Sequence, residues 1–249
     1  MSAKKNTRQK TSQTKAKTIP INPTFEGFTA AGFDFLSALE NNNQREWFQE
    51  NKKRYHQSVR DPFVDFIEAL SYRLEGSDLD LQGSKQSVFR IHRDTRFSKD
   101  KTPYKAHAGG VLSYSGTKKD QRGILYIQFA SDGGFMTAGF YQPESKVLGA
   151  IREAIAQNQK QSLSITQALS AKKLPLQATA SLKRMPRGFE AHQDAEVANL
   201  LKMKGHIMRQ DISPEQWKRP DIVETVAQFA HDTHPWIAFG RDAIAQMNG

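Results

Sequence analysis

Two apolar periodicities divide this sequence, and their order along the chain is the strongest constraint on how it can fold. Up to residue 74, apolar side chains recur every three or four positions, as on a helix with one buried face. Between residues 89 and 141 they recur every second position, which is typical of β-strands. The helical spacing returns after Pro143. Strands clustered between two helical regions predict an α+β fold: a single domain with a mainly antiparallel β-sheet, flanked by N- and C-terminal helices.

Residues 123–130 form the clearest predicted strand, because apolar side chains occupy both of its faces. Every second residue from Leu125 to Phe129 shares one face, and Ile124 and Tyr126 share the other. Apolar residues on both faces are typical of an internal strand. A hairpin turn is expected at 131–134, and further strands are expected at 109–114, 135–141, 178–184 and 206–212.

Proline positions predict where helices begin and end. The pair Asp61-Pro62 is a typical helix start, and an apolar face follows it at helical spacing. Pro235 is expected to separate two helices, because proline lacks the N–H that a helix interior needs. His231 and His234 would then lie at a helix end, where cationic side chains are favourable, and we predict no metal site from them.

The formal net charge of +10 is concentrated in two places. Residues 1–24 carry six basic residues, no acidic residue and very few apolar ones, so we predict a disordered basic tail. Residues 85–105 carry seven basic and two acidic residues, a net charge of +5. The rest of the chain is close to neutral. Residues 25–249 are therefore predicted to form a single α+β domain with one strongly basic segment.

This basic segment is the candidate functional site. A strand over residues 88–96 would turn Phe89 and Ile91 toward the core and the alternate residues outward. The outward row consists of Arg90, His92, Asp94 and Arg96. Guanidinium groups bind phosphate or carboxylate in bidentate fashion, and a strand would hold them rigidly.

We therefore expect the segment to bind an anionic ligand. Its basic side chains would supply the charge, and the ring of Tyr104 would stack on a base or donate a hydrogen bond. A second basic loop, residues 183–189, is expected to complete the rim. The expected partner is a phosphate-bearing small molecule or a nucleic acid. The predicted ligand-binding residues are Arg90, Arg93, Arg96, Lys101, Tyr104, Lys105, Arg184 and Arg187.

Two alternatives remain open. In the first, the protein is an enzyme acting on a phosphorylated or nucleic-acid substrate, with His92 or Asp94 transferring a proton. In the second, it is a structural or interaction domain whose charges pair with one another. The expected pairs are Asp94 with Arg93 or Arg96, and Asp100 with Lys52 or Lys53.

Composition excludes several other classes of function. Without cysteine, the chain has no disulfide framework, Cys-ligated zinc site, iron–sulfur cluster or thiol nucleophile. No apolar run is long enough to span a membrane, and no secretory signal is recognisable. Glycine-rich nucleotide loops and the nucleophile elbow of hydrolases are also missing. The sequence identifies no cofactor and leaves the oligomeric state open.

Three motifs, in this order, resemble a known family. The first is Asn41-Asn42 with Glu46-Trp47-Phe48 and Asn51-Lys52, the second runs from Arg90 to Lys105, and the third runs from Leu182 to Phe189. Together they resemble the uncharacterised domain of unknown function 2461 family, a conserved hypothetical family of bacteria and fungi. The resemblance covers about residues 25–235. It implies one family domain in a cytoplasmic protein, and it implies no established activity, cofactor or catalytic residue.

Overall fold

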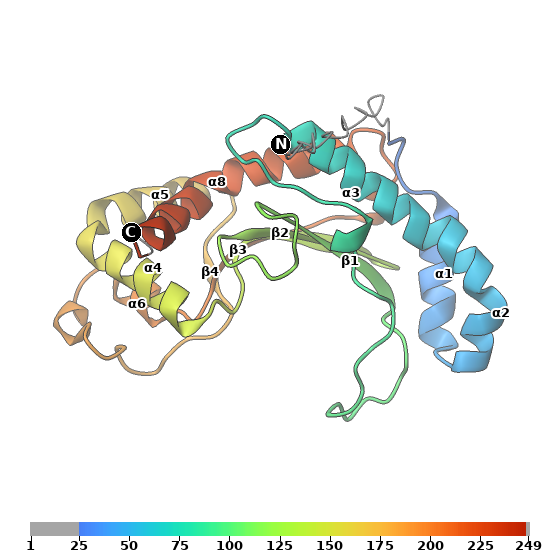
Figure 1. Ribbon diagram of the computed structural model, residues 1–249, viewed down its shortest axis with the longest axis horizontal. Helices are drawn as coiled ribbons and strands as arrows, with labels where there is room; N and C mark the ends of the chain where they lie inside the picture. The colour runs from blue at the N-terminus through green and yellow to red at the C-terminus, as the bar shows by residue number, and fades with distance from the viewer. Residues whose placement is uncertain (1–24, 248–249) are drawn as a thin grey trace, which may run out of the picture.

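The structure is a computed structural model that describes residues 25–247 (Figure 1). Its first helices are α1 (Ala30–Asn41), α2 (Arg45–Tyr55) and α3 (Asp61–Leu74). A π-helical turn, His56–Arg60, joins α2 directly to α3. α3 begins at Asp61 with Pro62 in its first turn, as predicted, but no break in the helical path separates it from α2.

Within residues 25–247, five strands form one antiparallel sheet in the order β1-β2-β3-β5-β4. They are β1 (His107–Ser113), β2 (Ile124–Ala130), β3 (Gly133–Phe140), β4 (Gln177–Ala178) and β5 (His206–Asp211). β2 and β3 form the predicted hairpin, with Ala130 opposite Gly133. The strands predicted at 109–114 and 206–212 are confirmed as β1 and β5, whereas the one predicted at 178–184 is reduced to the two residues of β4. The α+β prediction is confirmed.

Helices pack on one face of the sheet. Alternate residues of β2, from Leu125 to Phe129, are fully buried on that face. Phe129 stacks on Phe28 with 4.2 Å between ring centroids, and α3 and α8 lie against β1 and β3 (Figure 1). Ile124 and Tyr126 belong to the opposite face, where they are half-buried. β2 is an internal strand, as predicted, but its second apolar face is not covered in the same way as the first.

The remaining helices are α4 (Ser145–Gln157), α5 (Gln159–Ala171), α6 (Ala198–Lys202), α7 (Pro214–Trp217) and α8 (Ile222–Gln246). α8 passes through Pro235 without ending, so the prediction of two separate helices is wrong. An interior proline costs about 3 kcal/mol. Trp236 and Ile237 are almost completely buried beside it, and their packing offsets that cost. His231 and His234 consequently lie inside a helix rather than at its end.

Residues 88–106, here called the arm, precede β1 and project beyond the sheet, away from α3 and α8 (Figure 1). At its base, the Phe89 N–H donates to the Gly109 carbonyl at 2.8 Å, and Ile91 is buried in the core. The arm therefore extends from the β1 edge of the sheet.

The strand predicted over residues 88–96 is wrong, because this part of the arm forms isolated bridges instead of a continuous ladder. His92 and Tyr104 form one such bridge. It is flanked by two hydrogen bonds, from the Arg93 N–H to the Pro103 carbonyl and from the Lys105 N–H to the Ile91 carbonyl. Pro103 has no N–H to return a bond, so regular pairing stops there.

Two further observations concern the ends of the chain and membrane-spanning helices. The predicted disordered tail, residues 1–24, lies outside the described residues, as do the last two residues of the predicted domain. Within residues 25–247, no helix combines the length and the apolar character needed to cross a membrane.

Candidate functional site

The base of the arm is attached to the corner between α1 and α2. The Asn43 side-chain amide donates to the Tyr104 carbonyl and accepts from the Tyr104 N–H, at 3.0 Å in both cases. The Tyr104 ring stacks on Phe48 with 4.1 Å between centroids and is only 3% exposed. The predicted contact between Tyr104 and a ligand stays a prediction. The ring belongs to the core and fixes the arm.

The neck of the arm is held by one arginine. The Arg93 guanidinium donates to the Asp100 carboxylate and, at 2.5 Å, to the Thr102 hydroxyl. Asp100 also accepts the Thr102 N–H at 2.9 Å. The sequence predicts that Asp100 pairs with Lys52 or Lys53. In the structure its partner is Arg93, because the two halves of the arm face each other.

The tip of the arm is held by its own polar groups as well. Arg96 donates to both carboxylate oxygens of Asp94, at 3.0 and 2.7 Å, as the model of internal pairing predicted. The Lys101 amine donates to the Thr95 carbonyl at 2.9 Å. Three of the predicted ligand-binding cations, Arg93, Arg96 and Lys101, are thus bonded within the arm itself.

The two predicted proton-transfer residues lack the environment of a general base. The hydrogen bond from the Arg96 side chain lowers the pKa of Asp94, which stabilises the carboxylate and makes it a weak proton acceptor. The pKa of Asp100 falls to about 2, mainly through the Thr102 N–H and then through Arg93. His92 is exposed, and its ring meets the Tyr104 ring at 5.2 Å. Within residues 25–247, no hydrogen bond orients the His92 imidazole.

A different set of cations surrounds Phe89, at the base of the arm. The Lys118 amine lies 5.0 Å from the centre of the Phe89 ring, and the Lys105 amine lies 5.3 Å from it. Lys118 also donates to the Val88 carbonyl at 2.8 Å. Arg90, the next residue in the chain, completes what we call the cation cluster: Arg90, Lys105 and Lys118.

Electrostatics within the cation cluster are repulsive. Burial lowers the pKa of Lys105, and the charges of Arg90 and Lys118 lower it further. Burial also lowers the pKa of Lys118. None of the three cations forms an ion pair within residues 25–247, although Arg90 acts weakly on Asp94. The cluster therefore differs from Arg93 and Arg96, which are paired with carboxylates of the arm.

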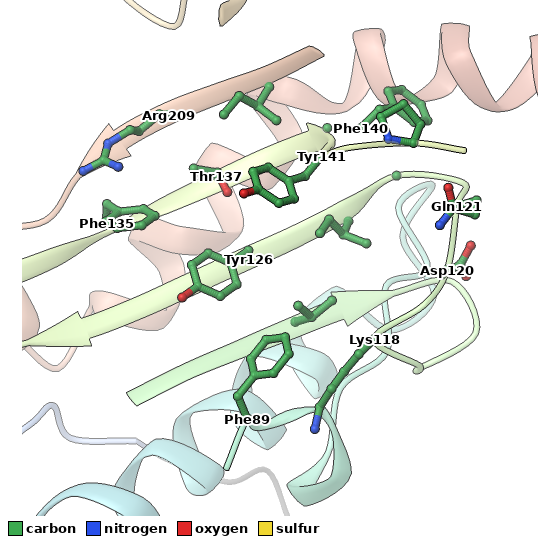
Figure 2. Close-up of a pocket in the computed structure, with 16 residues that line it drawn as sticks. Phe89, Lys118, Asp120, Gln121, Tyr126, Phe135, Thr137, Phe140, Tyr141 and Arg209 are labelled. Carbon is green, nitrogen blue, oxygen red and sulfur yellow. The ribbon is translucent and has the colours of Figure 1, made fainter. Parts of the chain in front are cut away.

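Next to the cation cluster, the second face of the sheet is hollowed (Figure 2). This hollow has a volume of about 490 Å³. One row of its floor crosses four strands, from Val111 through Tyr126 and Thr137 to Arg209. Phe89 and Lys118 line both the hollow and the neighbouring groove that contains Arg90. The cluster and the hollow are consequently continuous.

Arg184 and Arg187 lie away from this site. They follow β4, at one edge of the sheet, whereas the arm extends from β1 at the other edge. Three strands lie between them, so at about 4.8 Å per strand spacing the two edges are about 19 Å apart. The structure does not bring these arginines together with the cation cluster, and their part in ligand binding stays a prediction.

A comparison with protein families shows to which family the chain belongs. A family model described as "Conserved hypothetical protein (DUF2461)" matches residues 31–239. The chain belongs to this family. The match spans the arm, the cation cluster and the hollow, and it confirms the resemblance seen in the sequence. No curated protein and no solved structure matches the chain significantly.

Several residues of the DUF2461 site escaped sequence reasoning. Phe135 and Arg209 are far from the basic segment in the sequence, and strand pairing brings them near it. Lys118 lies in the loop between β1 and β2. One signal was present, because β2 carries apolar residues on both faces. Ile124 and Tyr126 indicate an internal strand, and in this structure they also form part of the floor of the hollow.

Proposed function

We propose that this protein binds a phosphate-bearing ligand through the cation cluster formed by Arg90, Lys105 and Lys118. The observation that supports this function is the convergence of these cations at the base of the arm without an ion-pair partner in the described residues. Lys105 and Lys118 lie over the Phe89 ring, and Arg90 is near enough for its charge to act on Lys105. Cations normally repel one another when they are placed close together and partly desolvated. An anion at this position relieves the repulsion.

The chemistry of the three side chains suits phosphate. Arg90 is exposed and has five N–H donors in a planar fork. Lys118 uses one amine proton for the Val88 carbonyl, which leaves two protons for a ligand. Charge-assisted hydrogen bonds to phosphate are about twice as strong as neutral ones. The proposed anion site thus retains two of the cations predicted from the sequence, Arg90 and Lys105, and adds Lys118.

The other cations of the basic segment have a different role in this proposal. Arg93, Arg96 and Lys101 hold the arm in shape, because their donors already bond to groups of the arm. Catalysis by His92 or Asp94 is not included in the proposal, since Asp94 is a weak base. The cytoplasmic location expected from the sequence stays a prediction.

Calorimetric titration with inorganic tripolyphosphate tests the proposal. Replacing Lys105 or Lys118 by glutamine should weaken binding about tenfold, the effect of losing one charge-assisted hydrogen bond of about 1.5 kcal/mol. Raising the salt concentration from 50 to 200 mM should weaken binding to the unmodified protein, because phosphate contacts release counterions.

Two substitutions provide matched controls. Lys119→Gln removes an exposed cation beside Lys118 that lines neither the hollow nor the neighbouring groove. Arg96→Gln removes a cation of the arm that is bonded to Asp94. Both controls should change the affinity less than twofold. Equal losses in all four variants would indicate nonspecific attraction to positive charge and would contradict the proposed site.

A further inference from the structure

The hollow carries an aromatic row that the cation cluster alone does not explain. Three half-buried rings follow one another from the arm across β2 to β3: Phe89, Tyr126 and Phe135. The centroids of Phe89 and Tyr126 are 6.1 Å apart, and those of Tyr126 and Phe135 are 5.8 Å apart. Figure 2 shows these rings on the same face of the sheet. Half-exposed rings of this kind provide surfaces on which planar groups stack.

Small residues keep the floor of the hollow open beside these rings. Gly109 of β1 leaves room for the Tyr126 ring, because a methyl group there would lie 2.9 Å from the Tyr126 hydroxyl oxygen. Thr137 lies opposite Tyr126, and Gly139 lies opposite Ile124. The resulting volume of about 490 Å³ falls in the range of small-molecule sites, roughly 300–1,000 Å³.

Polar groups lie at the far end of the aromatic row. The Arg209 guanidinium is 3.7 Å from the centre of the Phe135 ring, and it is also paired with Asp211 at 2.8 Å. The hydroxyl of Thr137 faces the hollow between Tyr126 and Arg209 (Figure 2). Within residues 25–247 this hydroxyl has no hydrogen-bond partner, so it is available to a polar edge of a bound ring.

The arrangement therefore has cations at one end, stacking surfaces in the middle and hydrogen-bonding groups at the other end. We propose that the hollow binds a nucleoside phosphate, with the base on Tyr126 and Phe135 and the phosphate at Lys118 and Arg90. Lys118 and Phe89 line both parts of the site, so one ligand of nucleotide size reaches both. This inference rests on the proposed function, because the cation cluster supplies the phosphate contact.

Calorimetry on the full chain tests the inference with four probes: ATP, UTP, tripolyphosphate and adenosine. Stacking of one base strengthens binding about tenfold, so at least one nucleotide should bind about tenfold more tightly than tripolyphosphate. Phe135→Leu and Tyr126→Leu should remove this gain and leave the affinity for tripolyphosphate unchanged. Tyr72→Leu, at a half-exposed tyrosine of α3 outside the hollow, is the matched control and should leave all affinities unchanged.

The outcomes separate the two proposals. If tripolyphosphate binds as tightly as both nucleotides, and Phe135→Leu has no effect, the base site is wrong and the phosphate site stands. If no phosphate probe binds, the proposed function is wrong, and the proposed nucleoside phosphate site is then wrong as well. Tighter binding of a ten-nucleotide oligodeoxythymidine, lost in Phe135→Leu, would assign the site to single-stranded nucleic acid and overturn a single nucleotide as its occupant.

Discussion

The side-chain amide of Asn43 forms two hydrogen bonds with the backbone of Tyr104, one in each direction and each 3.0 Å long. The two residues are 61 positions apart. The amide pairs with Tyr104 as a neighbouring strand would, and so it completes the bonding of the arm where regular pairing ends. Asn43 thereby connects the helical corner to the segment that presents the cation cluster.

Replacing Asn43 by alanine should lower the free energy of unfolding by about 2 kcal/mol, since two hydrogen bonds of about 1 kcal/mol each are lost. The Tyr104 amide should also exchange its hydrogen faster, because its acceptor is gone. Urea unfolding and amide exchange measure the two effects. Asn41→Ala is the control, because the Asn41 amide bonds only to Ser37 of its own helix. Equal losses in both variants would show that the link to Tyr104 is unimportant.

The stacked pair of Phe48 and Tyr104 predicts a larger effect. Tyr104→Ala should destabilise the protein by about 3–5 kcal/mol, because a buried aromatic ring is replaced by a cavity. Tyr104→Phe keeps the ring and should cost less than about 1.5 kcal/mol. Thermal or urea unfolding measures both values. A mild effect of Tyr104→Ala, combined with weaker tripolyphosphate binding, would support Tyr104 as a ligand contact.

The periodicity of the sequence predicted most of the sheet and the helices, because burial on one side repeats with the geometry of each element. Leu125, Ile127 and Phe129 are an example, and they lie on the covered face of β2. The arm also alternates, at Phe89 and Ile91, but a strand needs a continuous partner. Whether that partner exists depends on Pro103 and on the distant Asn43, and local alternation does not contain this information.

Charge counts predicted the right region of the site and only part of its membership. The sequence does not distinguish the seven cations of this segment by their pairing. In the fold, Arg93 and Arg96 bond to carboxylates, whereas Arg90 and Lys105 have no such partners in the described residues. Lys118 joins them because its loop follows β1. Pairing of this kind depends on side-chain positions, so the sequence is compatible both with an anion site and with a self-paired network.

Two helical glycines test how close packing competes with helix propensity. A methyl group at Gly149 of α4 would meet no atom within 4 Å, so Gly149→Ala should stabilise the protein by about 0.5–1 kcal/mol. A methyl group at Gly240 of α8 would lie 2.3 Å from the Phe140 ring. Gly240→Ala should therefore destabilise by about 1–3 kcal/mol despite the better propensity of alanine. Urea unfolding of both variants checks the opposite signs, and the same sign in both would refute this packing argument.

His206 predicts how stability depends on pH. Its imidazole is fully buried and donates from Nε2 to the Leu200 carbonyl at 3.1 Å, and burial lowers its pKa to about 4. The unfolded chain has a histidine pKa near 6.5, so between pH 6.5 and 4 the unfolded state binds a proton that the folded state does not. Stability should thus fall as the pH drops through this window, by up to about 3 kcal/mol from this residue.

Urea unfolding at pH 7.5, 6.5, 5.5 and 4.5 measures how the free energy of unfolding depends on pH. His206→Gln should reduce this slope while shifting stability above pH 7 by a constant amount. An imidazole that titrates near pH 6.5 in the folded protein, followed by NMR, would contradict the prediction without requiring the variant to fold.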